Sequence, residues 1–343
     1  MSNAEFASTA AEAGAPAAGH DRIAAVDCGT NSIRLLIADV TRADDGTRAD
    51  AGAPTLTDVH REMRIVRLGQ GVDATGELNP EAIERTRAAL HDYVELMLKH
   101  GVTRVRMTAT SATRDAANRD DFFTMTGVEL GRVVAGAQAE VITGDEEARL
   151  SFAGAVGELS SAQGPFVVVD LGGGSTEVVL GDASGVQSAY SADIGCVRIT
   201  ERCLHGNPPT REEVAAARFF ASERLAQAFG VVPVERARTW VGVAGTMTTI
   251  AAVSLDLPEY DSERVHLTRL PLSELRAVCD RLIGMTHDER AALGPMHPGR
   301  VDVIGGGAVI AEVLADELAR RAGIGELIVS EHDILDGIAL SIA

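Results

Sequence analysis

Apolar residues in this chain gather into short runs, and two pairs of these runs predict β-hairpins. Runs at residues 23–26 and 33–40 flank a polar turn that contains Gly29. Runs at residues 167–169 and 177–180 flank a second turn, which contains three successive glycines. Apolar runs joined by a glycine-containing polar turn are typical of antiparallel strand pairs.

The two predicted hairpins align without a gap at an offset of 170 − 27 = 143 residues. Both flanking strands stay in register over this alignment. Because the offset is about one domain length, the repeat indicates a duplicated domain. The coinciding positions are Asp27 with Asp170, Gly29 with Gly172, Ser32 with Ser175 and Asp39 with Asp182.

The remaining sequence alternates predicted helices with predicted strands. One helix begins at Asn79, where an N-cap residue precedes a first-turn proline and an acid, and it ends at Gly101. Such alternation predicts an α/β fold, and the hairpins make its sheets mixed. The other predicted strands are 104–109, 139–142, 239–243, 301–304 and 326–330, and the other predicted helices are a short one after 110–114, then 143–157, 211–229, one from 246, 272–284, 307–322 and 333–342.

These elements divide the chain into a tail and two domains. Residues 1–20 are rich in alanine and lack the apolar segment of a signal peptide, so we expect a disordered tail. We expect an N-terminal domain over 21–145, joined by the C-terminal helix 331–343, and a C-terminal domain over 146–330. Since no apolar run approaches the ~20 residues that a membrane-spanning helix needs, a soluble protein is expected.

The composition excludes several classes of function. Asp and Glu number 50 against 31 Lys and Arg, and the net charge of −19 disfavours nucleic acids and anionic membranes as partners. Aromatic residues make up only 3% of the chain, too few for a base-stacking surface. Lys99 is the only lysine and follows no glycine run, so a lysine-dependent P-loop is excluded. The four cysteines lack metal-ligand spacing, which fits a reducing cytoplasm.

The second hairpin turn carries the strongest candidate chemistry. Its glycines, Gly172, Gly173 and Gly174, leave room for several backbone N–H groups to face one anion. The hydroxyls of Ser175 and Thr176 add further donors. The anion that best suits such a turn is a phosphate group.

Two acids bracket this turn, Asp170 before it and Glu177 after it. On adjacent strands, two carboxylates can share a divalent cation that faces a bound phosphate. The alternative is a tight turn whose glycines only supply positive φ angles. The matching turn at residues 27–32 weakens that alternative, because it offers a second phosphate contact.

Several charged residues allow two interpretations each. The acids at 145–147 suit the first turn of a helix, where they stabilise the helix dipole, but one of them can instead serve as a general base for water. Arg61, Arg64, Arg67 and Arg114 divide between solvated surface and bidentate phosphate contacts.

Two further glycine runs are ambiguous. The runs around Gly245 and Gly305 do not complete a dinucleotide-binding motif, so we interpret them as strand-to-helix turns. Packing and ligand contact remain open for both.

Six segments together resemble the exopolyphosphatase and guanosine pentaphosphate phosphohydrolase (Ppx/GppA) family. The resemblance covers nearly all of the chain from Arg22 onward. It implies a duplicated actin-like, ribonuclease H-like ATPase fold, with two mixed sheets flanked by helices and a cleft between the domains. The six segments are Asp27-Cys-Gly-Thr-Asn-Ser, Arg67-Leu-Gly-Gln-Gly, Ala109-Thr-Ser-Ala-Thr-Arg-Asp, Gly144-Asp-Glu-Glu-Ala-Arg-Leu, Asp170-Leu-Gly-Gly-Gly-Ser-Thr-Glu and Gly242-Val-Ala-Gly-Thr.

The resemblance also assigns roles to residues. It implies that Glu147 is the catalytic base and that Asp170 and Glu177 hold magnesium, or manganese in its place. One family segment differs: the late Leu-Arg-Glu-Gly appears here as Leu335-Asp-Gly, without the arginine. The implied terminal-phosphate contacts are Asn31, Ser32, Arg114, Gly172, Gly173, Gly174, Ser175 and Thr176.

The function expected from these residues and the resemblance is hydrolysis of the terminal phosphate of inorganic polyphosphate. The first alternative shares the same machinery but takes guanosine pentaphosphate. A second alternative, of another class, is a nucleotide-gated actin-like binding module. The resemblance further implies a homodimer, the cysteine usage fits the cytoplasm, and we expect neither nucleic acid nor a membrane as partner.

Overall fold

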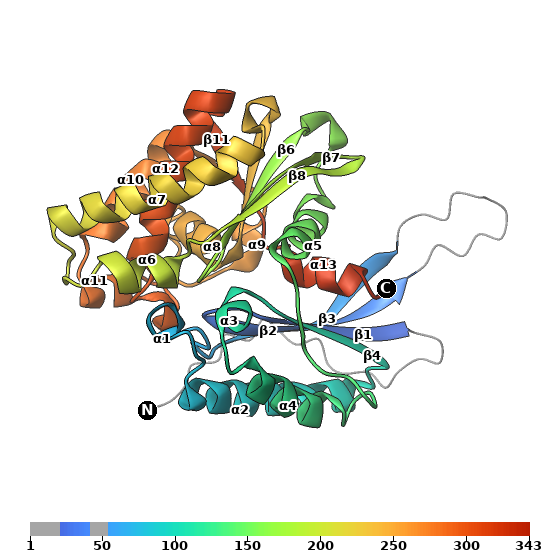
Figure 1. Ribbon diagram of the computed structural model, residues 1–343. Coiled ribbons are helices and arrows are strands. Elements are labelled where there is room, and N and C mark those ends of the chain that lie inside the picture. The colour runs from blue at the N-terminus through green and yellow to red at the C-terminus, as the bar shows by residue number, and fades with distance from the viewer. Residues whose placement is uncertain (1–20, 42–53) are drawn as a thin grey trace. The chain divides into compact units, whose positions relative to one another are not determined.

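The structure, a computed structural model, describes residues 21–41 and 54–343 (Figure 1). The predicted tail at 1–20 lies outside these described residues. The chain forms two compact units, and the C-terminal segment belongs to the same unit as the N-terminal part of the chain. Unit 1 comprises the chain up to Ile142 together with Leu335–Ala343, and unit 2 comprises Thr143–Ile334. The boundary expected at 145/146 and this division at 142/143 lie within one helical turn of each other.

Unit 1 is built on a five-stranded mixed sheet in the order β3-β2-β1-β4-β5. The central strand β1 pairs antiparallel with β2 and parallel with β4. Its strands are β1 (Asp21–Cys28), β2 (Ser32–Thr41), β3 (Thr55–Ile65), β4 (Arg104–Ala109) and β5 (Glu140–Val141). Its helices are α1 (Val72–Thr75), α2 (Pro80–His100), α3 (Ser111–Asp115), α4 (Arg119–Leu130) and most of α13 (Ile334–Leu340).

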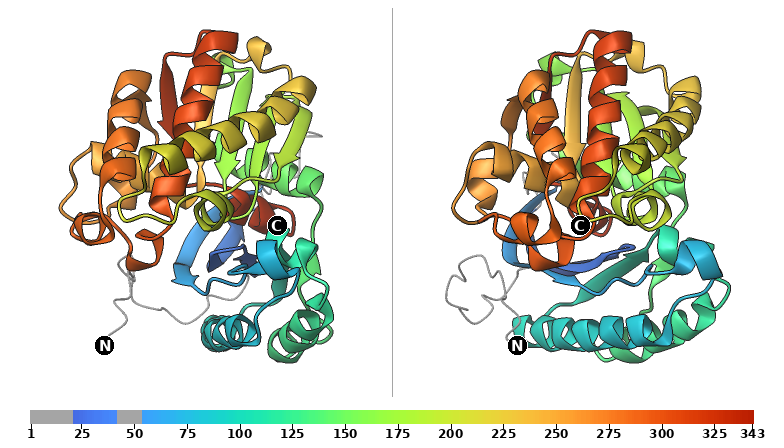
Figure 2. Two further views of the ribbon diagram at one scale, coloured as in Figure 1. Left: turned by 60° about the vertical axis from the view of Figure 1, so that its left-hand side comes forward. Right: turned by 90° about the vertical axis from the view of Figure 1, so that its left-hand side faces the viewer.

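Helix α2 has the ends that its sequence predicts. The Asn79 side chain accepts the backbone N–H of Glu81, Pro80 occupies the first turn, and Gly101 closes the helix with a φ of 69°. Its apolar side packs with alternate residues of β1 and β2 into one core. Helices α2 and α4 therefore cover one face of the sheet (Figures 1 and 2).

Unit 2 is built on a six-stranded mixed sheet in the order β10-β11-β9-β6-β7-β8. Its strands are β6 (Phe166–Leu171), β7 (Thr176–Asp182), β8 (Gly185–Ala192), β9 (Thr239–Val243), β10 (Thr268–Pro271) and β11 (Glu326–Val329). Its helices are α5 (Gly144–Val156), α6 (Cys196–Cys203), α7 (Arg211–Val231), α8 (Ala244–Ser254), α9 (Ser262–Val265), α10 (Leu272–Gly284), α11 (His287–Ala291) and α12 (Ile304–Ala322), with 3-10 turns at Ser161–Gln163, Val234–Arg236 and Pro298–Arg300.

Strands β6 and β7 are buried on both faces, and each face packs into its own core. Val167, Val169 and Leu171 of β6 belong to a large core shared with α6, α7, α8, α10 and α12. Phe166 and Val168, which point the other way, pack with α5 in a smaller core. Figure 2 shows the large helical layer on its side of the sheet.

The two sheets confirm the duplication that the sequence predicts. Strands β8-β7-β6-β9-β11 of unit 2 follow the same order and directions as β3-β2-β1-β4-β5 of unit 1. The two hairpin turns close with the same bond, from Gly29 N–H to Ser32 O (2.9 Å) and from Gly172 N–H to Ser175 O (3.1 Å). The expected α/β fold with two mixed sheets is therefore confirmed.

The strand expected at 301–304 is wrong. Residues 301–303 form turns, and Ile304 is the first residue of α12. A short apolar run fits a buried helix as well as a buried strand, and here the run leads into a helix that is buried on most sides. Within the described residues, no helix is both long enough and apolar enough to cross a membrane.

Candidate functional site

Asp170 and Glu177 face each other across the second hairpin. They form a directly opposed pair in the antiparallel register of β6 and β7, so their side chains lie on the same face of the sheet. Because side chains alternate along a strand, Asp170 shares this face with Phe166 and Val168, which pack against α5. The acid pair therefore lies on the face that α5 covers.

Helix α5 begins tightly against β8. Thr143 caps the helix by accepting the backbone N–H of Glu146 at 3.2 Å. A Cβ atom at Gly144 would lie 2.5 Å from the Cβ of Ser191, so only glycine allows this approach. Ser191 is itself paired with Glu177 in the sheet and donates its hydroxyl to Glu177 Oε1 at 2.7 Å.

A second contact fixes the next turn of α5. The hydroxyl of Ser151 donates to Asp170 Oδ2 at 2.6 Å, and Ser151 is fully buried. Glu147 lies between Gly144 and Ser151 at helical spacings of three and four residues, so all three share one side of the helix. The structure thus brings Glu147 to the side of α5 that faces Asp170 and Glu177.

The burial of these acids has an electrostatic consequence. Glu147, Asp170 and Glu177 are exposed by only 6%, 6% and 1%, although ionised carboxylates are costly to remove from water. Opposed like charges add repulsion to that cost. Carboxylate oxygens, supported by serine hydroxyls, are the donor set that a hard divalent cation prefers. The residues present therefore fit the magnesium site that the family resemblance implies.

The glycine turn presents its carbonyl groups to α6. Backbone N–H groups at the start of α6 donate to the oxygens of Gly172 (3.0 Å from Cys196) and Gly173 (2.9 Å from Val197), and Arg198 Nε donates to Gly174 O at 2.8 Å. In a planar trans peptide the N–H points opposite to the C=O. The N–H groups that follow these three carbonyls are therefore directed away from α6, as an anion-binding turn requires.

Close packing holds the turn in this orientation. A Cβ atom at Gly195 would overlap the backbone of Gly173 and Gly174. Ser175 is nearly fully buried, and its carbonyl accepts the bond that closes the hairpin. Thr176 is fully buried and donates its hydroxyl to Ile194 O at 2.6 Å, which anchors the segment before α6. The phosphate contacts expected at Ser175 and Thr176 stay predictions.

Unit 1 positions the other three expected phosphate contacts. The backbone oxygen of Asn31 accepts the N–H groups of Val66 (3.1 Å) and Arg67 (2.9 Å), which ties the first hairpin turn to the loop after β3. Ser32 opens β2. Arg114, at the end of α3, donates to Ile142 O at 2.9 Å. Their roles toward phosphate stay predictions as well.

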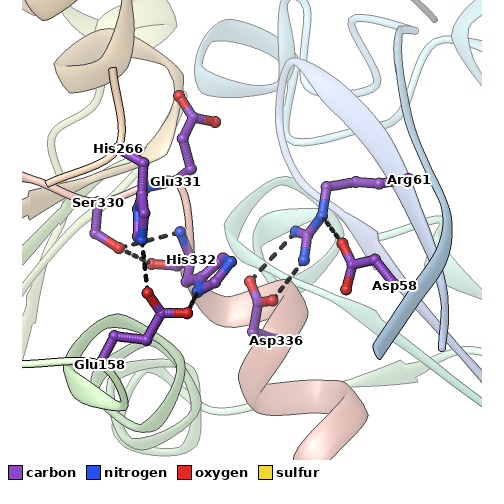
Figure 3. Close-up of polar contacts among 8 residues, drawn as sticks. All are labelled: Asp58, Arg61, Glu158, His266, Ser330, Glu331, His332 and Asp336. Carbon is purple, nitrogen blue, oxygen red and sulfur yellow. Dashed lines mark hydrogen bonds and ion pairs between the residues drawn. The ribbon is translucent and has the colours of Figure 1, made fainter. Parts of the chain in front are cut away.

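Two of the arginines to which the sequence allows two roles form ion pairs with carboxylates. Arg61 donates to Asp336 (2.5 Å) on α13 and to Asp58 (2.8 Å), as Figure 3 shows. Burial alone lowers the pKa of Arg61, but the two carboxylates raise it overall. Arg64 pairs with Glu62 and Asp92. Both arginines therefore hold unit 1 together.

The other glycine runs are closely packed. A Cβ atom at Gly245 would meet the guanidinium of Arg300, and one at Gly305 would meet that of Arg290. A Cβ atom at Gly306 would meet Thr200, and one at Gly307 would meet Thr246. These contacts explain the glycines by the close approach of neighbouring side chains.

Unit 2 contains another group with metal-ligand chemistry. Ligand atoms of Glu158, His266 and His332 lie within 4.8 Å of one another (Figure 3). However, Nδ1 of His266 accepts the backbone N–H of Glu331 at 3.2 Å, so in a neutral ring the proton lies on Nε2 and is donated to Glu158 at 3.0 Å. A metal needs that Nε2 lone pair, so the arrangement favours a hydrogen-bonded cluster.

Sequence reasoning missed the residues that support the acids. Ser151 and Ser191 bind the two carboxylates, and Gly144 lets α5 approach β8. The spacing of Ser151, four residues after Glu147, was the only local signal for its position. Ser191 lies on β8, a strand that the apolar pattern did not reveal.

Comparison with known proteins places this geometry in a family. The family model described as "Ppx/GppA phosphatase family" matches residues 47–342. Exopolyphosphatase 2 of Mycobacterium tuberculosis is 64% identical over 322 residues, which cover 94% of this chain and 98% of that protein. A crystal structure of an exopolyphosphatase-like protein has a TM-score of 0.84 at 40% identity, covering 94% of this chain and 98% of its own. That of an Aquifex aeolicus Ppx/GppA family member has a TM-score of 0.73 at 31% identity, with 94% and 97% covered.

The two matching mixed sheets, with a glycine turn and buried acids at the second hairpin, define a duplicated α/β protein. Within that class the matches are specific. The chain belongs to the Ppx/GppA phosphatase family.

Proposed function

We propose that this protein is an exopolyphosphatase, which hydrolyses the terminal phosphoanhydride bond of linear inorganic polyphosphate and releases orthophosphate. The observation that carries the proposal is the convergence of Glu147 with the opposed pair Asp170 and Glu177, in a chain that is 64% identical to a protein named exopolyphosphatase. A base beside two cation-binding acids is the equipment that phosphoanhydride hydrolysis requires.

In the proposed reaction, the Glu147 carboxylate accepts a proton from a water molecule as the water oxygen attacks the terminal phosphorus. The bond from that phosphorus to the bridging oxygen breaks, and the shortened chain keeps the electron pair. One water is consumed, and one orthophosphate leaves. Ser151, which is bonded to Asp170 one turn after Glu147, fixes the helix that carries the base.

The proposed phosphate contacts are backbone N–H groups of the glycine turn. Because the carbonyls of Gly172, Gly173 and Gly174 are engaged by α6 and Arg198, the turn has its donors already oriented before substrate binds. Asn31, Ser32 and Arg114 complete the proposed set. No lysine is needed, which agrees with a chain that has only one.

Asp170 and Glu177 are the proposed ligands of magnesium, or of manganese in its place. When bound, such a cation neutralises phosphoryl oxygens as charge shifts to the leaving group. We also propose that the protein is a homodimer, as the family resemblance implies, and that it acts in the cytoplasm, which its unpaired cysteines fit. Guanosine pentaphosphate is the competing substrate.

The experiment is a substrate comparison with the purified full-length protein. Phosphate release is measured from polyphosphates of several chain lengths, from guanosine pentaphosphate and from ATP at matched concentration, with Mg²⁺, with Mn²⁺ and with chelator. The proposal expects the highest kcat/KM on polyphosphate and loss of turnover in chelator. Faster release from guanosine pentaphosphate at every concentration would assign the competing activity instead. ATP-stimulated binding of a partner, without phosphate release from polyphosphate, would favour the nucleotide-gated binding module.

A further inference from the structure

The two hairpins differ in charge at one matched position. At the offset of 143 residues that aligns Asp27 with Asp170, Arg34 falls on Glu177, since 34 + 143 = 177. The sheet registers agree: Asp27 is directly opposed to Arg34 in unit 1, and Asp170 is directly opposed to Glu177 in unit 2. An acid pairs with a base in one unit, whereas it pairs with a second acid in the other.

The Asp27–Arg34 contact is a formed ion pair. Both Nη2 (2.7 Å) and Nε (3.1 Å) of Arg34 donate to Oδ2 of Asp27. The side chains are exposed by 19% and 7%, so the pair is largely removed from water. A guanidinium in such a place neutralises the carboxylate and restricts its orientation.

The surroundings of the two acids otherwise match. As whole residues, Asp27 and Asp170 are exposed by 5% and 6%. Each precedes a turn that closes with the same backbone bond, from Gly29 to Ser32 and from Gly172 to Ser175.

A segment from elsewhere in the chain is bonded to the matching face of each sheet. In unit 1 it is Ser341, the residue after α13: Arg106, which is registered with Ala25 on the Asp27 side of the sheet, donates to Ser341 at 2.7 Å. In unit 2, Ser151 of α5 bonds to Asp170 itself. The matched sites share their burial and turn closure, and they differ in the charge opposite the first acid and in the serine bonded to Asp170.

This difference decides where a cation is needed. The opposed side chains sum to no net charge in unit 1 and to −2 in unit 2 when ionised. A buried carboxylate requires a positive partner, and unit 1 supplies one in its own sequence. The serine hydroxyls that bond to Asp170 and Glu177 are neutral and do not supply one.

We propose that Arg34 is a built-in cation, which occupies in unit 1 the position that a divalent ion takes in unit 2. The chain then has one divalent-cation site where its duplicated fold offers two, and Arg34 determines which hairpin lacks it. The first hairpin turn accordingly contacts phosphate without a metal. This inference rests on the cation site of the proposed function.

The test counts bound Mn²⁺ ions per chain, using free-Mn²⁺ electron paramagnetic resonance and calorimetric titration. Four proteins are compared: the wild type, Arg34→Glu, Glu177→Arg and the double variant that exchanges the two residues. Arg34→Gln is the matched control, because it removes the guanidinium without adding an acid. Circular dichroism and thermal melts identify any variant that does not fold.

We expect a single ion in the wild type, a second ion in Arg34→Glu, and none in Glu177→Arg. The double variant should regain a single ion, now held in unit 1, and Arg34→Gln should bind as the wild type does. If folded Arg34→Glu binds no more Mn²⁺ than the wild type, the inference is wrong. If Arg34→Glu does not fold, the double variant decides, because its failure to regain an ion contradicts the inference equally.

Failure of the proposed function gives a different pattern. A wild type that binds no Mn²⁺ removes the cation site from unit 2, whatever Arg34 does. In that case an ion gained by Arg34→Glu still supports the role of Arg34, and no gain overturns both. The difference between Arg34→Glu and the wild type therefore tests the inference separately from the activity.

Discussion

Ser151 donates its hydroxyl to Asp170 across 2.6 Å, one helical turn after Glu147. This bond joins the helix that carries the proposed base to the strand that carries a proposed cation ligand. Both ends of the contact are buried, so water does not replace it when it is lost. We therefore expect Ser151 to act by orienting Asp170.

Replacing Ser151 by alanine should lower kcat on polyphosphate by about 10- to 100-fold, the usual effect of losing a residue that orients a metal ligand. The Mg²⁺ concentration for half-maximal activity should rise as well, because Asp170 loses its fixed orientation. Steady-state kinetics at varied Mg²⁺ measure both. The exposed Ser160→Ala is the control and should change neither. Unchanged Mg²⁺ dependence in Ser151→Ala would show that the bond only supports folding.

Replacing Gly195 by alanine should disrupt the glycine turn. The new Cβ atom would overlap the backbone of Gly173 and Gly174, which cannot move aside as a flexible side chain does. We expect a lower melting temperature together with a raised KM for polyphosphate. Gly230→Ala is the control, because a Cβ atom there meets nothing and alanine favours the helix by about 1 kcal/mol. Equal behaviour of the two variants would contradict the packing described for the turn.

The sequence predicted those features that have a local signal, and it did not predict contacts that arise from packing. The ends of α2 follow from Asn79 and Gly101, and the opposed pair of acids follows from the turn between β6 and β7. Contacts made by packing had no such signal, since Ser191 reaches Glu177 only because β8 pairs with β7.

Two elements show why the rest of the fold was harder to predict. Strand β3 went unrecognised because charged residues such as Arg61 and Arg64 interrupt its apolar pattern, and their carboxylate partners come from elsewhere in the fold. The run at 301–304 was assigned to the wrong element because a buried helix start and a buried strand look alike over four residues.

Replacing Asp336 by alanine should destabilise the protein by about 1–3 kcal/mol, because it leaves the half-buried guanidinium of Arg61 without its main partner on α13. Urea unfolding followed by circular dichroism measures the change. Asp92→Ala is the control, since Asp92 is exposed by 55% and its pairing with Arg64 should contribute about 0–1 kcal/mol. A loss in Asp336→Ala no larger than in Asp92→Ala would show that α13 is held by other contacts.

Glu158 should stabilise the protein in a pH-dependent way. Its hydrogen bond with His266, with the charge of His332, lowers the pKa of Glu158 below its ordinary value of 4.5. A lowered folded-state pKa means that the stabilisation is present above pH 4.5 and is lost as the pH falls through the folded value. Since Glu158 is half-exposed, the effect should be at most about 1 kcal/mol.

The measurement is the free energy of unfolding of the wild type and of Glu158→Gln between pH 6 and about pH 3. The difference between them should shrink toward zero at the acidic end. Glu259→Gln, an exposed acid of the same unit, serves as the control. A difference that grows as the pH falls would contradict the lowered pKa.

The central claim, that Glu147 is the base of a polyphosphate-hydrolysing site, is tested most directly by single-turnover phosphate release from polyphosphate with Glu147→Gln. Asp145→Asn is the matched control, because Asp145 stands in the same first turn of α5 but is exposed and paired with Arg149. The account predicts that Glu147→Gln binds polyphosphate and releases phosphate at least about 100-fold more slowly, as loss of a general base does. It predicts near-normal release from Asp145→Asn. Release from folded Glu147→Gln at a rate close to that of the wild type would contradict the account.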